Sequence, residues 1–174
     1  MTEIINKLLA TATLLSHVFL VIALVYIFIT KENNFVKKFL EKYGLLLAWL
    51  VAVFSATLSL YYSDIVGFEA CSLCWWQRIF IYPQAIFLGI AYFKKEFRYS
   101  SLYAIVLSII GMLIGIYQNA LYYGVPQIGA CDSSLTAVSC TKLYILEFGY
   151  ITIPVMSLTA FLLMIFFLKL QKKN

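Results

Sequence analysis

Long runs without a charged residue constrain the fold of this chain more than any other feature. No Asp, Glu, Lys or Arg occurs from Leu8 to Thr30 or from Tyr43 to Ser63. Each run can form a helix of about 30 Å, the thickness of the hydrocarbon core of a bilayer. Only 12% of the residues are charged, against about a quarter in soluble domains, so the chain cannot cover itself with an aqueous surface. The sequence therefore predicts a membrane-spanning helical bundle.

Five spanning helices are expected in this bundle. A cleaved signal peptide is the alternative for the first, but it would start with basic residues, whereas this chain starts Met-Thr-Glu. His17 in that helix is expected either to hydrogen-bond inside the bundle or to relay protons. Gly111 and Gly115 in the fourth helix form a Gly-x-x-x-Gly pattern, which predicts close helix packing. The expected spans are residues 8–30, 43–63, 74–93, 100–123 and 150–168.

Basic residues are distributed unevenly between the connecting segments. Residues 31–42, 94–98 and 169–173 hold ten Lys or Arg, whereas all other segments hold three. Because cytoplasmic segments carry the excess of Lys and Arg, we expect a multi-pass protein of the cell membrane with its C-terminus in the cytoplasm. The N-terminus and both cysteine-containing loops are then outside. The net charge of +5 lies in these short segments and does not indicate a nucleic-acid partner.

Four cysteines, two in each outer loop, point to disulfide chemistry. They are Cys71, Cys74, Cys131 and Cys140. An even number of cysteines outside the membrane is typical of an oxidising compartment. An all-thiolate zinc site is one alternative, but eight residues separate the second pair instead of two to four, and structural zinc is unusual in such a loop. Two purely structural disulfides are the other alternative.

One cysteine has the expected surroundings of a reactive thiolate. Cys74 is placed where a short loop enters the third apolar segment, and Arg78 follows it by one helical turn. The positive end of a helix and a permanent cation both favour thiolate over thiol. A structural disulfide needs neither, so we interpret Cys71 and Cys74 as a redox-active pair. Snorkelling to the membrane interface is the alternative for Arg78.

Two cysteine pairs on one face of a membrane suggest an electron relay. A thiolate attacks a disulfide through a mixed disulfide, so electrons can pass from a soluble dithiol partner to one pair and then to the other. The sequence has no haem-ligand, Gly-rich dinucleotide or iron–sulfur pattern to receive them next. A lipid-soluble quinone is the remaining simple acceptor. We expect it beside Cys74, where Arg78 could stabilise a reduced, negatively charged ring oxygen.

Residues 71–78 also resemble a family signature. Their sequence, Cys-Ser-Leu-Cys-Trp-Trp-Gln-Arg, is similar to the Cys-x-Leu-Cys-x-x-Gln/Glu-Arg pattern of the DsbB family of membrane thiol oxidoreductases. Residues 139–158 resemble the last loop and helix of that family, and the short spacing from Cys131 to Cys140 looks more like its BdbC branch. The resemblance covers about residues 45–168.

This resemblance implies a fold and a function. The fold would be all-α and integral to the membrane, with a four-helix transmembrane bundle over residues 43–174. Residues 1–42 would add an N-terminal transmembrane helix and a cytoplasmic connector. The function would be that of a protein-disulfide:quinone oxidoreductase supporting disulfide bond formation. Such a protein reoxidises a secreted or periplasmic thioredoxin-like oxidase, of the DsbA or BdbD type, and passes the electrons to ubiquinone or menaquinone.

The resemblance also implies roles for the four cysteines. Cys131 would form the mixed disulfide with the oxidase, and Cys140 would resolve it. Cys74 would be the thiolate that meets the quinone, with Cys71 as its partner.

Neighbouring polar residues would complete the quinone site. The resemblance places Arg78 and Gln77 there as quinone-binding residues. Gln118 and Asn119 fall where many relatives carry a histidine in the fourth helix, and the sequence does not choose between them as a quinone contact. The helix over residues 8–30 has no counterpart in the usual four-span form, so its role is open.

Two other classes of function compete with this one. Reductases of the vitamin K epoxide reductase type are also small bundles with a Cys-x-x-Cys and a loop pair. Their loop cysteines precede the Cys-x-x-Cys, whereas here they follow it, which disfavours that class. A non-enzymatic membrane protein with two structural disulfides is the second competitor.

Overall fold

Five long α-helices make up most of the described chain. The computed structural model describes residues 2–29, 35–96, 98–126 and 139–171. Within these ranges there is no β-strand, only an isolated bridge between Glu147 and Ile151, so the expected all-α fold is confirmed. In chain order the elements are α1 (Thr2–Ile29), α2 (Phe35–Leu60), the short π-helix η1 (Tyr61–Ile65), α3 (Ser72–Lys94), α4 (Arg98–Tyr122) and α5 (Ile153–Leu170).

Helix α2 begins earlier than the charge pattern predicts. We expected a polar connector up to residue 42, but α2 starts at Phe35 and continues past that position without a break. Leu40 is only 2% exposed and belongs to the same core cluster as Leu45. Burial of this apolar side chain therefore favours helix in a stretch that contains several lysines. The proposed division between residues 1–42 and 43–174 does not coincide with an end of a helix.

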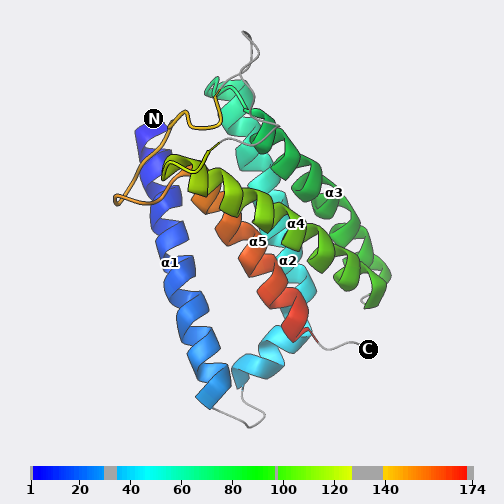
Figure 1. Ribbon diagram of the computed structural model, residues 1–174. Coiled ribbons are helices and arrows are strands. Elements are labelled where there is room, and N and C mark those ends of the chain that lie inside the picture. The colour runs from blue at the N-terminus through cyan, green and yellow to red at the C-terminus, as the bar shows by residue number, and fades with distance from the viewer. Residues whose placement is uncertain (1, 30–34, 97, 127–138, 172–174) are drawn as a thin grey trace.

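Helices α2 to α5 form the bundle, and α1 lies along its side (Figure 1). Helices α2 and α4 each pack on both α3 and α5, whereas α1 packs mainly on α5. The main core cluster takes residues from all four helices α2 to α5, and includes Leu45, Leu88, Ala104 and Met164. This arrangement is the expected four-helix bundle with one additional N-terminal helix.

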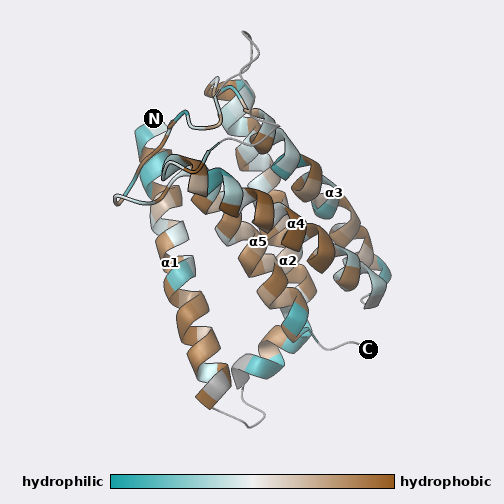
Figure 2. Ribbon diagram, in the orientation of Figure 1, coloured by the Kyte–Doolittle hydropathy of each residue, from teal (hydrophilic) through white to brown (hydrophobic). Residues whose placement is uncertain are grey.

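Four helices of the described chain are long and apolar enough to cross a membrane: α1, α2, α4 and α5. Large apolar side chains such as Ile22 and Leu113 are exposed on them, and Figure 2 shows hydrophobic residues along the middle of the helices. The chain is therefore a multi-pass membrane protein. Helix α3 has 23 residues but contains Gln77, Arg78 and Gln84, and a fifth span through it stays a prediction.

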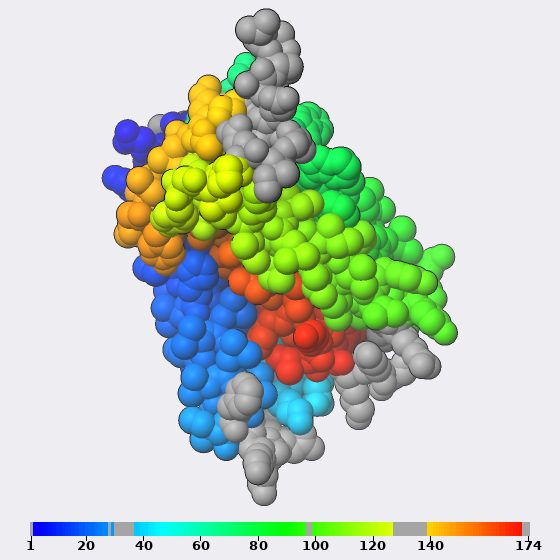
Figure 3. All heavy atoms as spheres, in the orientation of Figure 1, coloured from blue at the N-terminus to red at the C-terminus, as the bar shows by residue number. Residues whose placement is uncertain are grey.

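Both cysteine-containing regions lie at one end of the bundle. The start of α3 and the segment 139–152 are found at the same end as the start of α1, and α5 finishes at the other end (Figure 1). Figure 3 shows the segment 139–152 between the start of α1 and the end of α4. This placement agrees with the predicted alternation of spans. Which end faces the cytoplasm stays a prediction.

Close packing between α4 and α5 depends on one of the two glycines in the Gly-x-x-x-Gly pattern. A Cβ atom at Gly111 would overlap the ring of Phe161, which is fully buried. A Cβ atom at Gly115 would lie 3.6 Å from the nearest atom of Leu158, an ordinary contact distance. The predicted close packing is confirmed, and its tight point is Gly111.

We expect Gly111→Ala to destabilise the protein by about 1–3 kcal/mol, because overpacking a well-packed core has that cost. Gly115→Ala is the matched control in the same helix. It should be neutral or stabilising, because alanine is about 1 kcal/mol better than glycine in a helix interior. The measurement is the thermal unfolding midpoint of each purified variant in detergent. Midpoints that fall equally would contradict the packing described here.

Candidate active site

The Cys-x-x-Cys pair lies at the start of α3. Cys71 is the residue before the helix, and its Sγ accepts a hydrogen bond from the backbone N–H of Cys74 at 3.4 Å. The two Sγ atoms are 2.8 Å apart, and both residues are free thiols. The predicted position of Cys74 in the first turn of a helix is confirmed. The partial positive charge of that helix end favours a negative sulfur there.

A buried amide from α4 faces both sulfur atoms. The Nε2 group of Gln118 donates to Cys74 Sγ at 3.2 Å and to Cys71 Sγ at 3.4 Å. Gln77 Nε2 donates to Gln118 Oε1 at 2.7 Å, which fixes the orientation of the Gln118 amide. Both glutamines are buried. Because hydrogen-bond donors stabilise the charged form of a sulfur, this arrangement favours a thiolate.

Hydrogen bonding and burial divide the charge unequally between the two sulfurs. The hydrogen bond with Cys74, and then burial, raise the pKa of the Cys71 thiol well above its usual range. Cys71 therefore stays protonated, and its S–H group can donate a hydrogen bond to Cys74 Sγ. Cys74 also faces Gln118 and the helix N-terminus, so it holds the negative charge of the pair. This assignment agrees with the reactive thiolate expected at Cys74.

Arg78 connects α3 to the end of α2. Its Nε donates to Ser59 Oγ at 2.9 Å, and its Nη2 donates to the Ser59 carbonyl at 3.3 Å. The guanidinium also lies 5.0 Å from the centre of the Trp75 ring. Ser59 is in the last turn of α2, next to the π-helix η1, a rare conformation that often marks functional sites. These contacts hold the half-buried cation against the end of α2, where it lines a cavity, and this favours a role in the site over snorkelling.

The second cysteine pair is represented by Cys140, since Cys131 lies outside the described residues. Cys140 is disulfide-bonded, 1% exposed, and packed in one cluster with Cys71 and Leu121. Its Sγ is 3.6 Å from the Ser72 hydroxyl at the start of α3. The Cys140 half of a disulfide is thus buried directly against the Cys-x-x-Cys pair.

Two tyrosine hydroxyls hold the loop segment that carries Cys140. Tyr144 donates to the carbonyl of Glu69, in the loop before α3, at 3.1 Å. Tyr122, at the end of α4, donates to the carbonyl of Lys142 at 3.4 Å. The loop is therefore fixed to the two elements that supply Cys71 and Gln118.

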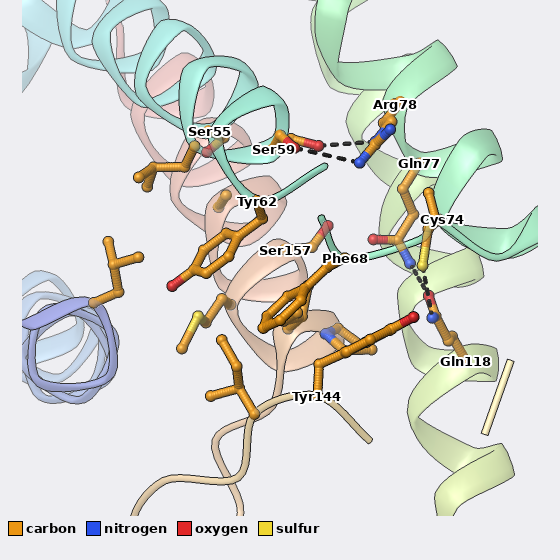
Figure 4. A pocket seen from close by; sticks show the side chains of 18 of the residues that line it. Ser55, Ser59, Tyr62, Phe68, Cys74, Gln77, Arg78, Gln118, Tyr144 and Ser157 are labelled. Atoms are coloured by element: carbon orange, nitrogen blue, oxygen red, sulfur yellow. Dashed lines mark hydrogen bonds between the residues drawn. The ribbon is translucent and has the colours of Figure 1, made fainter. Parts of the chain in front are cut away.

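A cavity of about 340 Å³ opens beside the sulfurs (Figure 4). Figure 4 shows Cys74, Gln77 and Gln118 on one side of it and Tyr62, Phe68 and Ser157 nearer its middle. Gln77, Arg78 and Gln118 line it beside Cys74, and helices α1, α2 and α5 contribute apolar side chains and hydroxyl groups to the remaining wall. A volume of this size is within the range of small-molecule sites.

Three aromatic rings stack along the cavity. Phe68 lies between Tyr62 and Tyr144, with ring centres 5.5 Å and 4.5 Å away and nearly parallel planes. Gly67, with φ of +79°, allows the loop to turn just before Phe68. The wall therefore offers flat aromatic surface beside the hydrogen-bond donors.

The structure brings Cys71, Cys74, Gln77 and Arg78 together around one cavity, as the sequence predicted. Of the two candidate amides in α4, Gln118 is the one that contacts the sulfurs. Asn119 is half-buried and is not among the described residues that line the cavity. Ser59 and the three stacked rings are additions that no periodic pattern indicated.

The zinc alternative finds no support at this site. Cys140 is disulfide-bonded and so offers no thiolate in this state. No group of three or more His, Cys, Asp or Glu side chains is placed to hold a metal within the part of the chain that the structure describes.

Comparisons with known proteins agree with this geometry. The profile of a family described as "Disulfide bond formation protein DsbB" matches residues 41–171. A probable disulfide formation protein C of Bacillus cereus is 45% identical over 123 residues, which cover 70% of this chain and 86% of the relative. Disulfide bond formation protein C of Bacillus subtilis is 41% identical over 125 residues, 72% of this chain and 89% of the relative. A probable disulfide formation protein of Coxiella burnetii is 38% identical over 135 residues, 76% of this chain and 90% of the relative. No solved structure matches.

Gln118→Leu should slow the alkylation of Cys74 by iodoacetamide several-fold at about pH 5, where only a small fraction of Cys74 is thiolate and the rate follows that fraction. The reason is that a hydrogen bond to a charged group contributes about 1.5 kcal/mol or more, so its loss lowers the thiolate fraction. The rate is measured on reduced protein by quenching and mass spectrometry. Asn119→Leu is the matched control and should leave the rate unchanged. Equal rates in wild type and Gln118→Leu would show that Gln118 does not stabilise the Cys74 thiolate.

Proposed function

The chain belongs to the DsbB family of disulfide bond formation proteins, and on that premise we propose that it is a protein-disulfide:quinone oxidoreductase of the cell membrane. It reoxidises a secreted or periplasmic thioredoxin-like oxidase, of the DsbA or BdbD type, and passes the electrons to ubiquinone or menaquinone. Its N-terminus and both cysteine loops face outside, and its C-terminus faces the cytoplasm.

The contact between the two redox pairs is the observation that carries this proposal. Cys140 is disulfide-bonded and packs against Cys71, and Cys74 lines the cavity together with both of them. Electrons that enter at the loop therefore have a short path to Cys71 and leave from Cys74. A purely structural disulfide would need neither amide donors at its sulfurs nor a cavity beside them.

The first half of the relay starts from two disulfides, Cys131–Cys140 and Cys71–Cys74. A thiolate of the reduced partner attacks Cys131 and forms a mixed disulfide, which releases Cys140 as a thiolate. Cys140 then attacks the sulfur of Cys71, its neighbour in the buried cluster. A Cys71–Cys140 bond forms and Cys74 leaves as the thiolate that Gln118 stabilises.

The second half restores the loop disulfide. The second thiol of the partner attacks the mixed disulfide, so the partner departs oxidised and Cys131 is released. Cys131 attacks Cys140, which re-forms Cys131–Cys140 and leaves Cys71 reduced. Two electrons have now moved from the partner to the Cys71–Cys74 pair. A Cys140 disulfide next to free Cys71 and Cys74 is the state that this sequence of steps produces.

A strong acceptor is needed to draw the relay forward. A DsbA-like partner has a potential near −120 mV, so an ordinary disulfide near −200 mV would oxidise it against a gradient of roughly 4 kcal/mol. A bound quinone supplies a two-electron, two-proton acceptor. The cavity suits such a molecule, because flat aromatic and apolar walls meet the Arg78 guanidinium beside Cys74. In this reading Arg78 compensates negative charge, and Gln77 lines the cavity while fixing Gln118.

Arg78→Ala should raise the apparent KM for quinone about tenfold, because a charge-assisted hydrogen bond of about 1.5 kcal/mol is lost. The assay follows quinone reduction by the purified full chain with a reduced thioredoxin-like oxidase. Cys74→Ser should abolish turnover. Arg78→Lys, which keeps the charge without the planar fork, should have an intermediate KM.

Thiol exchange with the partner provides the internal control for this test. A partner variant with only its attacking cysteine should form the mixed disulfide with wild type and Arg78→Ala at the same rate. Equal loss of both steps in Arg78→Ala would refute the quinone role of this residue. Absence of turnover by wild type with either ubiquinone or menaquinone would refute the proposed function.

A further inference from the structure

Helix α1 contributes a wall to the cavity although it lies outside the region that matches the family profile, which begins at residue 41. The α1 residues that line the cavity are Leu9, Ala12, Thr13 and Ser16. Their spacing of three and four places them on one face of the helix. This helix is therefore part of the same site as Cys74.

Two hydrogen bonds fix α1 on either side of this face. Asn6 accepts from the Tyr62 hydroxyl at 2.7 Å, and His17 Nε2 lies 2.7 Å from Thr159 Oγ1. The Thr159 hydroxyl donates to the Val155 carbonyl at 2.8 Å, so His17 is the donor in its contact with Thr159. Tyr62 and Thr159 themselves line the cavity. Of the two roles expected for His17, the structure supports the hydrogen bond within the bundle.

The two ends of the cavity differ in chemistry. Near α3 the wall carries Cys74 and the guanidinium of Arg78, which is suited to a polar ring oxygen. Near α1 the wall includes Leu9 and Ala12, and the hydroxyls of Thr13 and Ser16 are already used on backbone carbonyls of their own helix. The hydroxyls that α1 contributes are therefore not free to donate to a ligand, and Leu9 and Ala12 present an apolar surface.

We propose that α1 is the tail-binding wall of the quinone cavity, an assignment that rests on the proposed function. Its face around Leu9 and Ala12 contacts the first isoprenoid units, while the quinone ring is bound by the residues of α3 and α4. The opposite side of α1 faces lipid, and Val18 on that side is 49% exposed. Helix α1 thus sets the preference for tailed over tailless quinones. A lipid acyl chain is the competing occupant of this wall.

The test compares Ala12→Trp, which fills the α1 end of the cavity, with Val18→Trp, which adds the same side chain on the lipid face. Equilibrium dissociation constants are measured by calorimetry in detergent for a tetraprenyl menaquinone and for menadione, which has the same ring without a tail. The corresponding ubiquinone pair is measured in parallel. We expect Ala12→Trp to weaken tailed quinones about tenfold and tailless ones less than twofold, because only tail burial is lost. Val18→Trp should change neither.

Several outcomes would overturn the assignment. Equal weakening of tailed and tailless quinones would place the ring at α1, and no weakening of either would leave the wall to lipid. If Ala12→Trp does not fold, Leu9→Asn with Leu8→Asn as its exposed control gives the same comparison at nearly constant volume. Arg78→Ala should weaken both quinones, so a failure confined to the α1 variants leaves the proposed function intact. A wild-type protein that binds no quinone would refute both.

Discussion

The hydrogen bonds from Gln118 to the two sulfurs are the interaction on which the site depends. A thiolate in the low dielectric of a membrane bundle is unstable unless donors face it. Gln77 donates a hydrogen bond to the side-chain carbonyl of Gln118, so the N–H groups of the Gln118 amide remain directed at Cys71 and Cys74. With the start of α3 contributing its own partial charge, negative charge is stabilised on Cys74 while Cys71 keeps its proton. Cys74 is therefore the better leaving group in thiol exchange and the better electron donor toward the cavity.

This asymmetry separates two environments around one small dithiol. On the loop side, Cys140 packs against Cys71 and is held there by the segment that Tyr122 and Tyr144 fix. On the membrane side, Cys74 opens into a largely apolar cavity, where Ser59 holds the Arg78 guanidinium. In the proposed relay the partner reacts first with the loop cysteines, whereas Cys74 delivers electrons to the quinone. The additional helix α1 forms part of the wall of this cavity.

The sequence contains the helices and the redox centre but not the contacts between them. Charge-free runs predict the spans, and the Cys-x-x-Cys with Arg78 predicts a reactive pair at a helix start. Gln118 contacts Cys74, which lies 44 positions earlier in the chain, and Cys71, which lies 47 positions earlier. A local sequence pattern cannot predict contacts over such a separation. Phe68 and Tyr144 lie in short irregular loops, where periodicity carries no information. We predicted too late a start for α2, because the lysines around Leu40 indicate a polar connector, whereas tertiary packing buries the Leu40 side chain.

The order in which quinone oxidises the cysteines tests the central claim most directly. Fully reduced protein is mixed with quinone, quenched at increasing times and alkylated, and each cysteine is followed by mass spectrometry. The relay described here predicts that Cys71 and Cys74 lose their reactivity first and that Cys131 and Cys140 follow by exchange. Oxidation of the loop pair first, or oxidation of the loop pair at the wild-type rate in a Cys74→Ser background, would contradict the assignment of Cys74 as the sulfur that delivers electrons to the membrane.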